Sequence, residues 1–267
     1  MKKNKALQDI FVKKGYYNEF KISKKDTNFL KNLIKGTLLR NVKKIRKIKN
    51  KDLFYKALKK IDLKDYHKIS NTSDHRNLIK KKYRLIKPTD VNKIKKLNFF
   101  KKLKKIIPGF KILNIEKIYK EEIDFRIARP NKKDTSYLHR DEWFWTLNNL
   151  KIKNNCTKLN IWIPIICEKG RNGLRYVHKS HLKEYEIKST NKRYDGVLKP
   201  GLIKDKLNIS IFKSNPGECF IFNDRLIHGG LSGGIKTRIS MQWIMTINNN
   251  ILKKYVNQKY LNQSKKN

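Results

Sequence analysis

The sequence predicts a mainly β fold, an antiparallel sandwich or barrel, flanked by helices. Up to residue 107, apolar residues recur at helical spacing among many lysines. After Pro108-Gly109, short runs rich in β-branched and aromatic residues follow one another, separated by Gly, Pro and Asn, with no helical stretch between them. We treat residues 1–267 as one domain with a mostly helical part (1–107), a β core (108–250) and a basic tail (251–267).

Amphipathic repeats predict the helices of the first part. Apolar residues fall on one face over residues 30–39, as a helix that buries a single stripe requires. The same spacing recurs over residues 53–61 and 91–100. Asp90 is available as an N-cap for the helix predicted over residues 91–100. The polar stretch SNTSDHRN (70–77) predicts a loop.

The strands of the second part are predicted from short apolar runs with turn residues at their ends. Each run is rich in the β-branched and aromatic residues that favour a pleated, half-buried surface. The predicted strands cover residues 110–119, 122–130, 159–166, 173–178, 217–223 and 237–247.

The formal net charge of +44 is far above that of an ordinary soluble enzyme. Residues 1–120 carry most of it, with 38 Lys and Arg against 9 Asp and Glu. Such a charge is typical of proteins that bind nucleic acid, a lipid surface or a phosphorylated substrate. However, Lys greatly outnumbers Arg, which nucleic-acid surfaces favour, and the abundance of Lys, Asn and Ile would also follow from an A/T-rich genome. We therefore expect no nucleic-acid partner.

The sequence predicts neither a membrane span nor a secretory leader. No window approaches the roughly 20 apolar residues of a membrane span. The basic N-terminus lacks the apolar stretch of a secretory leader. Three scattered cysteines are too few for a disulfide framework and fit a reducing compartment. We expect a cytoplasmic protein, and the sequence leaves its oligomeric state open.

Two histidines and an aspartate stand out as candidate metal ligands. In LHRDEW, His139 and Asp141 are two residues apart, and side chains at i and i+2 of a strand point to the same face. His228 follows a predicted strand in FNDRLIHGG, beside glycines that allow a close backbone turn. Two imidazoles and one carboxylate on one side of a metal are typical of non-haem Fe(II), and they leave positions open for a 2-oxo acid and dioxygen.

An arginine at a characteristic distance strengthens this interpretation. Arg238 lies ten residues after His228 and could bind the far carboxylate of 2-oxoglutarate through a bidentate pair. Thr237 and Ser240 could add hydroxyl donors. A His-x-Asp pair alone occurs by chance in many chains. A second histidine 89 residues after His139, followed by the arginine, is a more specific pattern.

These segments, in this order, resemble the phytanoyl-CoA dioxygenase family of Fe(II)/2-oxoglutarate-dependent oxygenases over most of the chain. FVKKGYYNEFKIS (11–23) resembles the family's opening, and FRIARP (125–130) resembles its strand before the metal loop. IWIPI (161–165) resembles the central strand, and RNGLRYVHKSHL (171–182) resembles a segment that usually reads Asn-Gly-x-Leu and then Pro-Gly-Ser-His. GECFIFNDRLIHGG and KTRISMQW supply the distal histidine and the arginine.

The resemblance implies a double-stranded β-helix (a cupin-like jelly roll) with helices packed around it. It implies Fe(II), with 2-oxoglutarate and O2 as cosubstrates, and three metal ligands, His139, Asp141 and His228. It implies that Arg238 binds 2-oxoglutarate, that Trp162 walls the pocket beside it and that Phe125 lies on the cosubstrate side. The expected reaction is hydroxylation of a small substrate with release of succinate and CO2, because Asp141 stands where related halogenases have a small residue.

Substrate-side residues are less defined by the sequence. Trp143 and Trp145 follow Asp141 at strand spacing and could wall a substrate cavity, although plain core packing explains them equally well. His178-Lys179 stands where the family usually has Pro-Gly. We interpret this difference as an altered turn. The alternative is that His178 faces the substrate. The basic surroundings favour an anionic small molecule.

Two other functions remain open at the level of the sequence. A basic binding module on a jelly-roll scaffold, without turnover, would explain the charge of residues 1–120. An oxygenase acting on nucleic acid would use stretches such as KKLNFFKKLKK (95–105) to bind phosphates and stack bases. An amphipathic helix that buries its aromatic residues explains the same stretch more simply.

Overall fold

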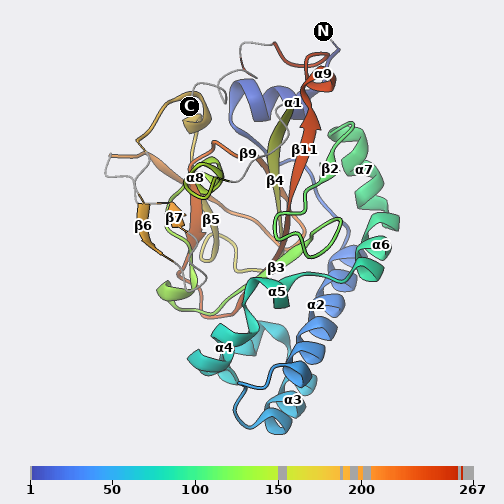
Figure 1. Cartoon of the computed structure of the whole chain (residues 1–267), viewed down its shortest axis with the longest axis vertical. Coiled ribbons are helices and arrows are strands. Elements are labelled where there is room, and N and C mark those ends of the chain that lie inside the picture. Colours follow the sequence, from blue (N-terminus) through green and yellow to red (C-terminus); the bar gives the residue numbers. More distant parts are fainter. Residues whose placement is uncertain are drawn as a thin grey trace.

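Two antiparallel sheets lie at the centre of the computed structural model, and helices of the first part cover the larger sheet on its outer side (Figure 1). The structure describes residues 2–149, 155–186, 189–192, 198–200, 206–257 and residue 260. The predicted antiparallel β core with flanking helices is confirmed.

The larger sheet is built on two long central strands. β4 (Cys156–Ile166) pairs with β11 (Arg238–Asn248) over most of its length, in a register that sets Trp162 opposite Gln242. The strand order is β1-β9-β4-β11-β2, and β3 also pairs with β11. All these pairs are antiparallel. The shorter strands are β1 (Tyr16–Tyr17), β2 (Lys111–Ile112), β3 (Asp124–Ala128) and β9 (Phe220–Asn223).

The smaller sheet packs against the inner face of the larger one through aromatic side chains. Its antiparallel order is β10-β5-β8. The Phe212 ring of this sheet lies 6.2 Å from Trp162 and 4.8 Å from Phe220, between ring centroids. The strands are β5 (Gly173–Val177), β8 (Ile209–Phe212) and β10 (His228–Leu231), and a separate pair consists of β6 (Ser189–Lys192) and β7 (Leu198–Pro200).

Helices of the first part bury their apolar faces against the outer face of the larger sheet. Ile34 and Phe100 share one buried cluster with Ile161 and Trp243 of the central strands. The rings of Phe100 and Trp243 stack with their centroids 6.2 Å apart. The helices before the β core are α1 (Lys5–Gln8), α2 (Lys24–Lys44), α3 (Lys51–Lys60), α4 (Thr72–Leu78), α5 (Lys81–Arg84), α6 (Pro88–Lys96) and α7 (Asn98–Ile106).

Shorter helical segments complete the described chain. Within the described residues, a π-helical turn follows α1, one 3-10 turn lies between α3 and α4, and two more lie in loops of the β core. Among the described residues from 108 onward, α8 and α9 are the only α-helices. Their bounds are η1 (Asp9–Lys13), η2 (Leu63–Lys68), η3 (Lys132–Asp134), η4 (Ser180–Leu182), α8 (Asp141–Leu147) and α9 (Asn249–Leu252).

Several details of the helical prediction are wrong. Within the predicted loop 70–77, residues 72–77 form most of α4, because the Asn71 side chain caps the helix by accepting a 2.8 Å hydrogen bond from the Asp74 backbone. Asp90 lies in the first turn of α6 and is not its N-cap, since Pro88 begins the helix.

The periodic stretches are also divided differently from the prediction. Residues 91–100 belong to two helices, α6 and α7, which meet at Leu97. Leu53 is 69% exposed on α3 instead of facing the core. In the second part, residues 110–119 form only the short strand β2, and the chain bends beyond it, with a φ of 54° at Lys117. The other predicted strands form with shifted ends.

Most of the basic-aromatic stretch 95–105 belongs to the amphipathic helix α7. Phe99 and Phe100 are 2% and 1% exposed, so their rings are not available for stacking on bases. Among the described residues, no helix has both the length and the apolar character of a membrane span.

Candidate metal centre and cosubstrate pocket

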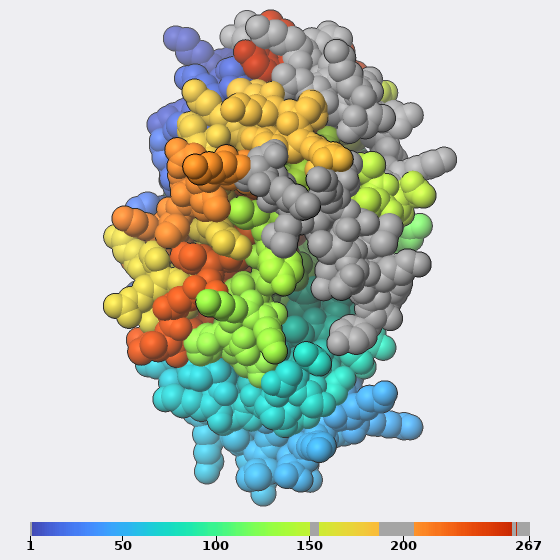
Figure 2. Space-filling model, turned by 90° about the vertical axis from the view of Figure 1, so that its left-hand side faces the viewer, coloured from blue at the N-terminus to red at the C-terminus, as the bar shows by residue number. Residues whose placement is uncertain are grey.

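His139 and His228 face each other across an isolated backbone bridge. Each backbone N–H donates to the other residue's carbonyl at 2.9 Å, and the two ring centroids are 4.6 Å apart. The approach depends on Gly229, where a Cβ would lie 2.7 Å from the Tyr137 carbonyl oxygen. On the face shown in Figure 2, light-green atoms of the segment before α8 lie against orange and red atoms of the C-terminal strands.

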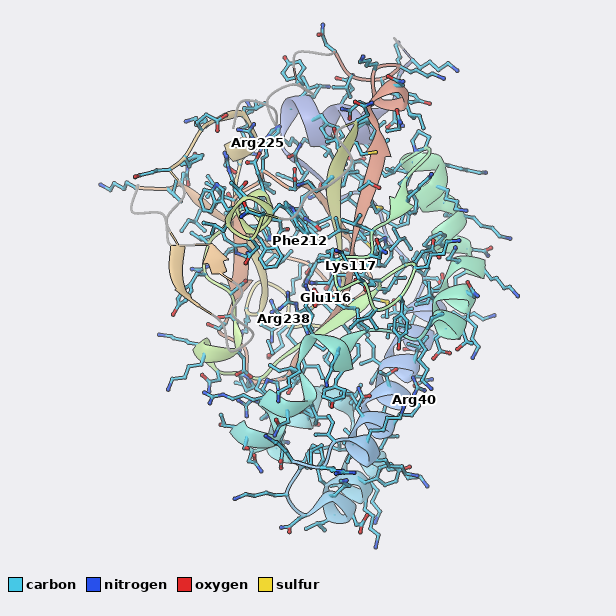
Figure 3. All side chains as sticks on the ribbon, in the orientation of Figure 1. Arg40, Glu116, Lys117, Phe212, Arg225 and Arg238 are labelled. Carbon is cyan, nitrogen blue, oxygen red and sulfur yellow. The ribbon has the colours of Figure 1, made fainter. Side chains whose placement is uncertain are left out.

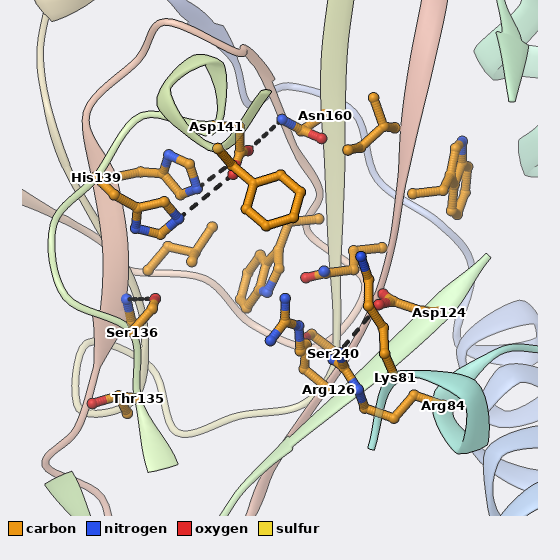
Figure 4. A pocket seen from close by; sticks show the side chains of 18 of the residues that line it. Lys81, Arg84, Asp124, Arg126, Thr135, Ser136, His139, Asp141, Asn160 and Ser240 are labelled. Atoms are coloured by element: carbon orange, nitrogen blue, oxygen red, sulfur yellow. Dashed lines mark hydrogen bonds and ion pairs between the residues drawn. The ribbon is translucent and has the colours of Figure 1, made fainter. Parts of the chain in front are cut away.

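Asp141 reaches the two histidines from the start of a helix. α8 begins at this residue, so the predicted strand geometry of the His-x-Asp pair is wrong, although the side chains do converge. The Asp141 Oδ1 lies 3.5 Å from His139 Nε2, and Oδ2 lies 3.6 Å from His228 Nε2 (Figure 4). One candidate ligand atom from each residue lies within 4.8 Å of the others, close enough to hold one metal ion.

Backbone carbonyls fix the orientation of both imidazoles. His139 Nδ1 lies 2.7 Å from the Tyr137 carbonyl oxygen, and His228 Nδ1 lies 2.9 Å from that of Leu226. Because a carbonyl only accepts, each Nδ1 carries the proton and each Nε2 keeps its lone pair. Both lone pairs therefore belong to the nitrogens nearest Asp141, as in histidines that bind a metal.

The charges of the cluster suit a metal ion. Burial opposes ionisation of Asp141, but the neighbouring His228 and His139 outweigh it and lower the pKa of the carboxyl to about 2. Burial lowers the pKa of His228 to about 4, against the opposing effect of Asp141. At neutral pH the site therefore offers a carboxylate and a neutral imidazole, the forms that bind metals.

Asn160 orients the Asp141 carboxylate, and sequence reasoning did not single it out. Its Nδ2 donates a 2.5 Å hydrogen bond to Asp141 Oδ2 (Figure 4). Asn160 lies on β4 and is 7% exposed. The available signal was its position, since it is a polar residue within the apolar run LNIWIPII.

Arg238 and Ser240 present unused polar groups to the pocket. Both line it from β11, and Figure 3 shows Arg238 in the interior of the molecule. Arg238 is 7% exposed, and its Nη1 donates to the Gly173 carbonyl. Its Nε and the Ser240 Oγ are buried with no hydrogen-bond partner among the described residues. Burial lowers the pKa of Arg238 to about 10, so the side chain remains a cation at neutral pH.

This environment fits a carboxylate ligand such as that of 2-oxoglutarate. A buried cation without a carboxylate partner is costly, and an anion bound through two N–H donors would offset that cost. The residues present therefore suit both groups that the sequence implies, a metal ion at the three ligands and a carboxylate at Arg238.

The other predicted cosubstrate residues divide between pocket and core. Trp162 lines the pocket. Thr237 does not line it, because its hydroxyl lies 3.0 Å from His67 Nδ1 and accepts a hydrogen bond from the His67 backbone. Phe125 is fully buried in the core behind the sheet, since strand alternation turns Asp124 and Arg126 toward the pocket instead.

Of the three predicted substrate residues, one lines the pocket and two lie elsewhere. Because Trp143 and Trp145 lie on a helix, they point in different directions, and only Trp145 lines the pocket. Trp143 is 1% exposed and packs against Arg140. His178 is exposed, lies 5.8 Å from the Tyr16 ring between centroids and is not among the residues that line the pocket.

The metal cluster and Arg238 open into one pocket of about 570 Å³. β3, β4 and β11 form its floor, and α8 and the loop before it form one wall. α5 of the helical part supplies Lys81 and Arg84 at the opposite wall (Figure 4). A volume in this range accommodates a small organic ligand with most of its surface buried.

The fold and the site together define an enzyme of the non-haem iron, 2-oxoglutarate-dependent oxygenase superfamily. The model of the family described as "Phytanoyl-CoA dioxygenase (PhyH)" matches residues 42–237, and the chain belongs to this family. The resemblance noted in the sequence is therefore confirmed, and so are Fe(II), 2-oxoglutarate and O2 as the cofactors it implied.

Solved structures share the fold at low sequence identity. The non-haem monooxygenase ThoJ, in its apo form, has a TM-score of 0.53 and 9% identity, over 91% of this chain and 79% of that one. SnoK, a non-haem α-ketoglutarate-dependent carbocyclase from nogalamycin biosynthesis, has a TM-score of 0.52 and 12% identity, over 91% and 83%. Among curated proteins, no sequence matches this chain.

Proposed function

We propose that this protein is an Fe(II)/2-oxoglutarate-dependent dioxygenase that hydroxylates a small, anionic organic substrate and releases succinate and CO2. The observation that carries the proposal is the convergence of His139, Asp141 and His228, with both Nδ1 atoms held by carbonyls and the three candidate ligand atoms within 4.8 Å of one another. The double-stranded β-helix remains part of the proposal, and the two facing antiparallel sheets support it.

Each residue of the candidate site has a defined task in this proposal. His139, Asp141 and His228 hold the iron, and Asn160 keeps the Asp141 carboxylate in place through its 2.5 Å hydrogen bond. Arg238 binds the far carboxylate of 2-oxoglutarate, with Ser240 as a further donor. Iron with 2-oxoglutarate and O2 supplies the oxidising chemistry, so the protein needs no nucleophile or general base of its own.

One feature favours hydroxylation over halogenation, and another favours a small organic substrate over a polymer. Asp141 supplies a carboxylate to the metal cluster, whereas a halogenase requires that position for halide. The pocket of about 570 Å³ is partly enclosed by Trp145 and Phe144, which suits a small organic substrate better than a polymer.

Production of succinate tests the proposal. We expect purified wild-type protein to convert 2-oxoglutarate to succinate slowly with Fe(II) and O2, even without added substrate. The His139→Ala variant should lose this activity, and Arg76→Gln, which changes an exposed residue of α4, should retain it. Absence of succinate from wild type, or equal amounts from wild type and His139→Ala, would favour a binding module without turnover.

A further inference from the structure

We propose that Arg126 binds a carboxylate or phosphate group of the substrate, so that the enzyme selects small organic anions with an apolar body. This inference rests on the proposed function and names the residue through which the substrate is recognised. It depends on three observations: the face on which Arg126 lies, the absence of an ion-pair partner for it among the described residues, and the apolar wall opposite.

Arg126 lies on the pocket face of β3. Its neighbours Phe125 and Ile127 are buried in the core behind the sheet, so alternation along the strand turns Arg126 to the other side. The register sets Arg126 opposite Ser240, and Arg238 opposite Ala128. Figure 4 shows the Arg126 side chain extending from β3 into the pocket, toward the side of His139 and Asp141.

Arg126 forms no ion pair or side-chain hydrogen bond with any residue that the structure describes. The carboxylates around the pocket already have partners of their own. Asp124 pairs with Arg84 at 3.6 Å, and Glu116 pairs with Lys81. Further along the wall, Glu122 accepts hydrogen bonds from backbone N–H groups at 2.7 and 2.9 Å, and Asp134 pairs with Arg129 at 2.7 Å. The guanidinium of Arg126 is therefore available to a ligand.

Arg238 and Arg126 suit different ligands. Arg238 is 7% exposed and lies beside the buried Ser240 hydroxyl, deep in the pocket. Arg126 is exposed, so it faces the part of the pocket that an incoming molecule meets first. Its planar fork can bind a carboxylate or a phosphate through two parallel hydrogen bonds. If Arg238 holds 2-oxoglutarate, Arg126 remains for the second organic anion of the reaction.

The remaining wall fits an apolar body. Phe144 and Trp145 line the pocket from α8, and Ile79, Leu85 and Ile115 line it from the segments around α5 and β2. An anion held at Arg126 would thus have its carbon skeleton between aromatic and aliphatic side chains, on the side of the metal cluster. The inferred substrate class is a small acid or phosphate ester with an aromatic or branched apolar part.

Binding of three matched probes tests the inference. We would titrate phenylacetate, phenyl phosphate and the neutral phenylacetamide into protein loaded anaerobically with Fe(II) and 2-oxoglutarate, and measure each Kd by calorimetry. Wild type should bind at least one anionic probe about tenfold more tightly than the amide, as a charge-assisted hydrogen bond predicts. The Arg126→Gln variant should lose that preference, Arg126→Lys should keep part of it, and the exposed control Arg76→Gln should keep all of it.

The affinity for 2-oxoglutarate separates this inference from the proposed function. The Fe(II)–2-oxoglutarate absorption band should titrate with the same Kd, within about twofold, in wild type and Arg126→Gln. A tenfold loss of 2-oxoglutarate affinity in Arg126→Gln would assign Arg126 to the cosubstrate and overturn the inference. The inference would also be overturned if wild type and Arg126→Gln preferred the anionic probes over the amide equally, or if wild type showed no such preference. Absence of the band from wild type would contradict the proposed function, while the probe comparison would still decide the role of Arg126.

Discussion

Asn160 donates a 2.5 Å hydrogen bond to the Oδ2 atom of Asp141, from the middle of a buried central strand to the first residue of α8. This contact connects the rigid sheet to the one candidate metal ligand that a helix supplies. The two histidines are instead fixed by backbone carbonyls of their own segments.

Replacing Asn160 should therefore weaken metal binding without unfolding the protein. We expect Asn160→Ala to lower the affinity for Fe(II) by roughly 10- to 100-fold, the usual effect of removing a group that orients a ligand. Competition with a chromogenic chelator under anaerobic conditions measures this affinity. The control Asn92→Ala changes an exposed residue of α6 and should bind iron as wild type does. An Asn160→Ala variant with wild-type iron affinity would show that the hydrogen bond does not position the ligand.

Substitution of Arg238 should affect the cosubstrate and spare the metal. In Arg238→Ala, the KM for 2-oxoglutarate should rise by at least about tenfold, because a charge-assisted bidentate pair is lost. Arg238→Lys should lie between this variant and wild type, since lysine keeps the charge but not the fork. Steady-state succinate assays give the KM, and chelator competition should give an unchanged iron affinity. Loss of iron binding together with 2-oxoglutarate binding would point to collapse of the pocket instead.

The contacts of Asp134 with Arg129 and His75 should make the pocket wall sensitive to acid. Asp134 Oδ2 lies 2.7 Å from Arg129 Nε and 3.1 Å from His75 Nε2 of α4. Burial opposes ionisation of Asp134, but these partners outweigh it and hold its pKa well below the usual range. Because the pKa is lower in the folded than in the unfolded state, the stabilisation is complete above about pH 4 and is lost as the pH falls below that value.

We therefore expect Asp134→Asn to lower the free energy of unfolding by about 3 kcal/mol at pH 7. The difference from wild type should shrink when both proteins are denatured with urea near pH 3. Asp52→Asn, at an exposed position of α3, serves as the matched control and should change stability little at either pH. If the unfolding free energies of wild type and Asp134→Asn differ by the same amount at both pH values, the lowered pKa of Asp134 in the folded protein is contradicted.

Packing between the helical part and the sheet should dominate stability. Phe100 is 1% exposed and stacks on Trp243 of β11, so Phe100→Ala should cost about 3–5 kcal/mol of unfolding free energy. Leu53→Ala removes a side chain that is 69% exposed and should cost little. Urea unfolding followed by circular dichroism compares them. Similar losses in the two variants would show that the helical part does not depend on this contact.

Sequence patterns predicted the parts of the fold that depend on local periodicity. The antiparallel strands around Trp162 and Met241 followed from apolar, β-branched runs, and the helix that buries Ile34 followed from its apolar stripe. Short elements were missed or misplaced. α4 was taken for a loop because its residues are polar, although the capping by Asn71 was readable in the sequence.

The candidate site was predicted better in its composition than in its geometry. His139, Asp141, His228 and Arg238 lie around one pocket, as their order in the chain suggested. That Asp141 begins a helix could not be read from His-x-Asp spacing, which suits a strand as well. The roles of Asn160 and Arg126 depend on the register between β3, β4 and β11, which brings together residues far apart in the sequence.

The most direct test of the account is an anaerobic titration of the protein with Fe(II) and 2-oxoglutarate, followed by visible absorption. We predict a metal-to-ligand charge-transfer band that saturates with one equivalent of each in wild type. The band should be absent from His139→Ala, and Arg238→Ala should require a higher concentration of 2-oxoglutarate to form it. A wild-type protein without the band, together with a His139→Ala variant that binds iron equally well, would contradict the assignment of the metal centre.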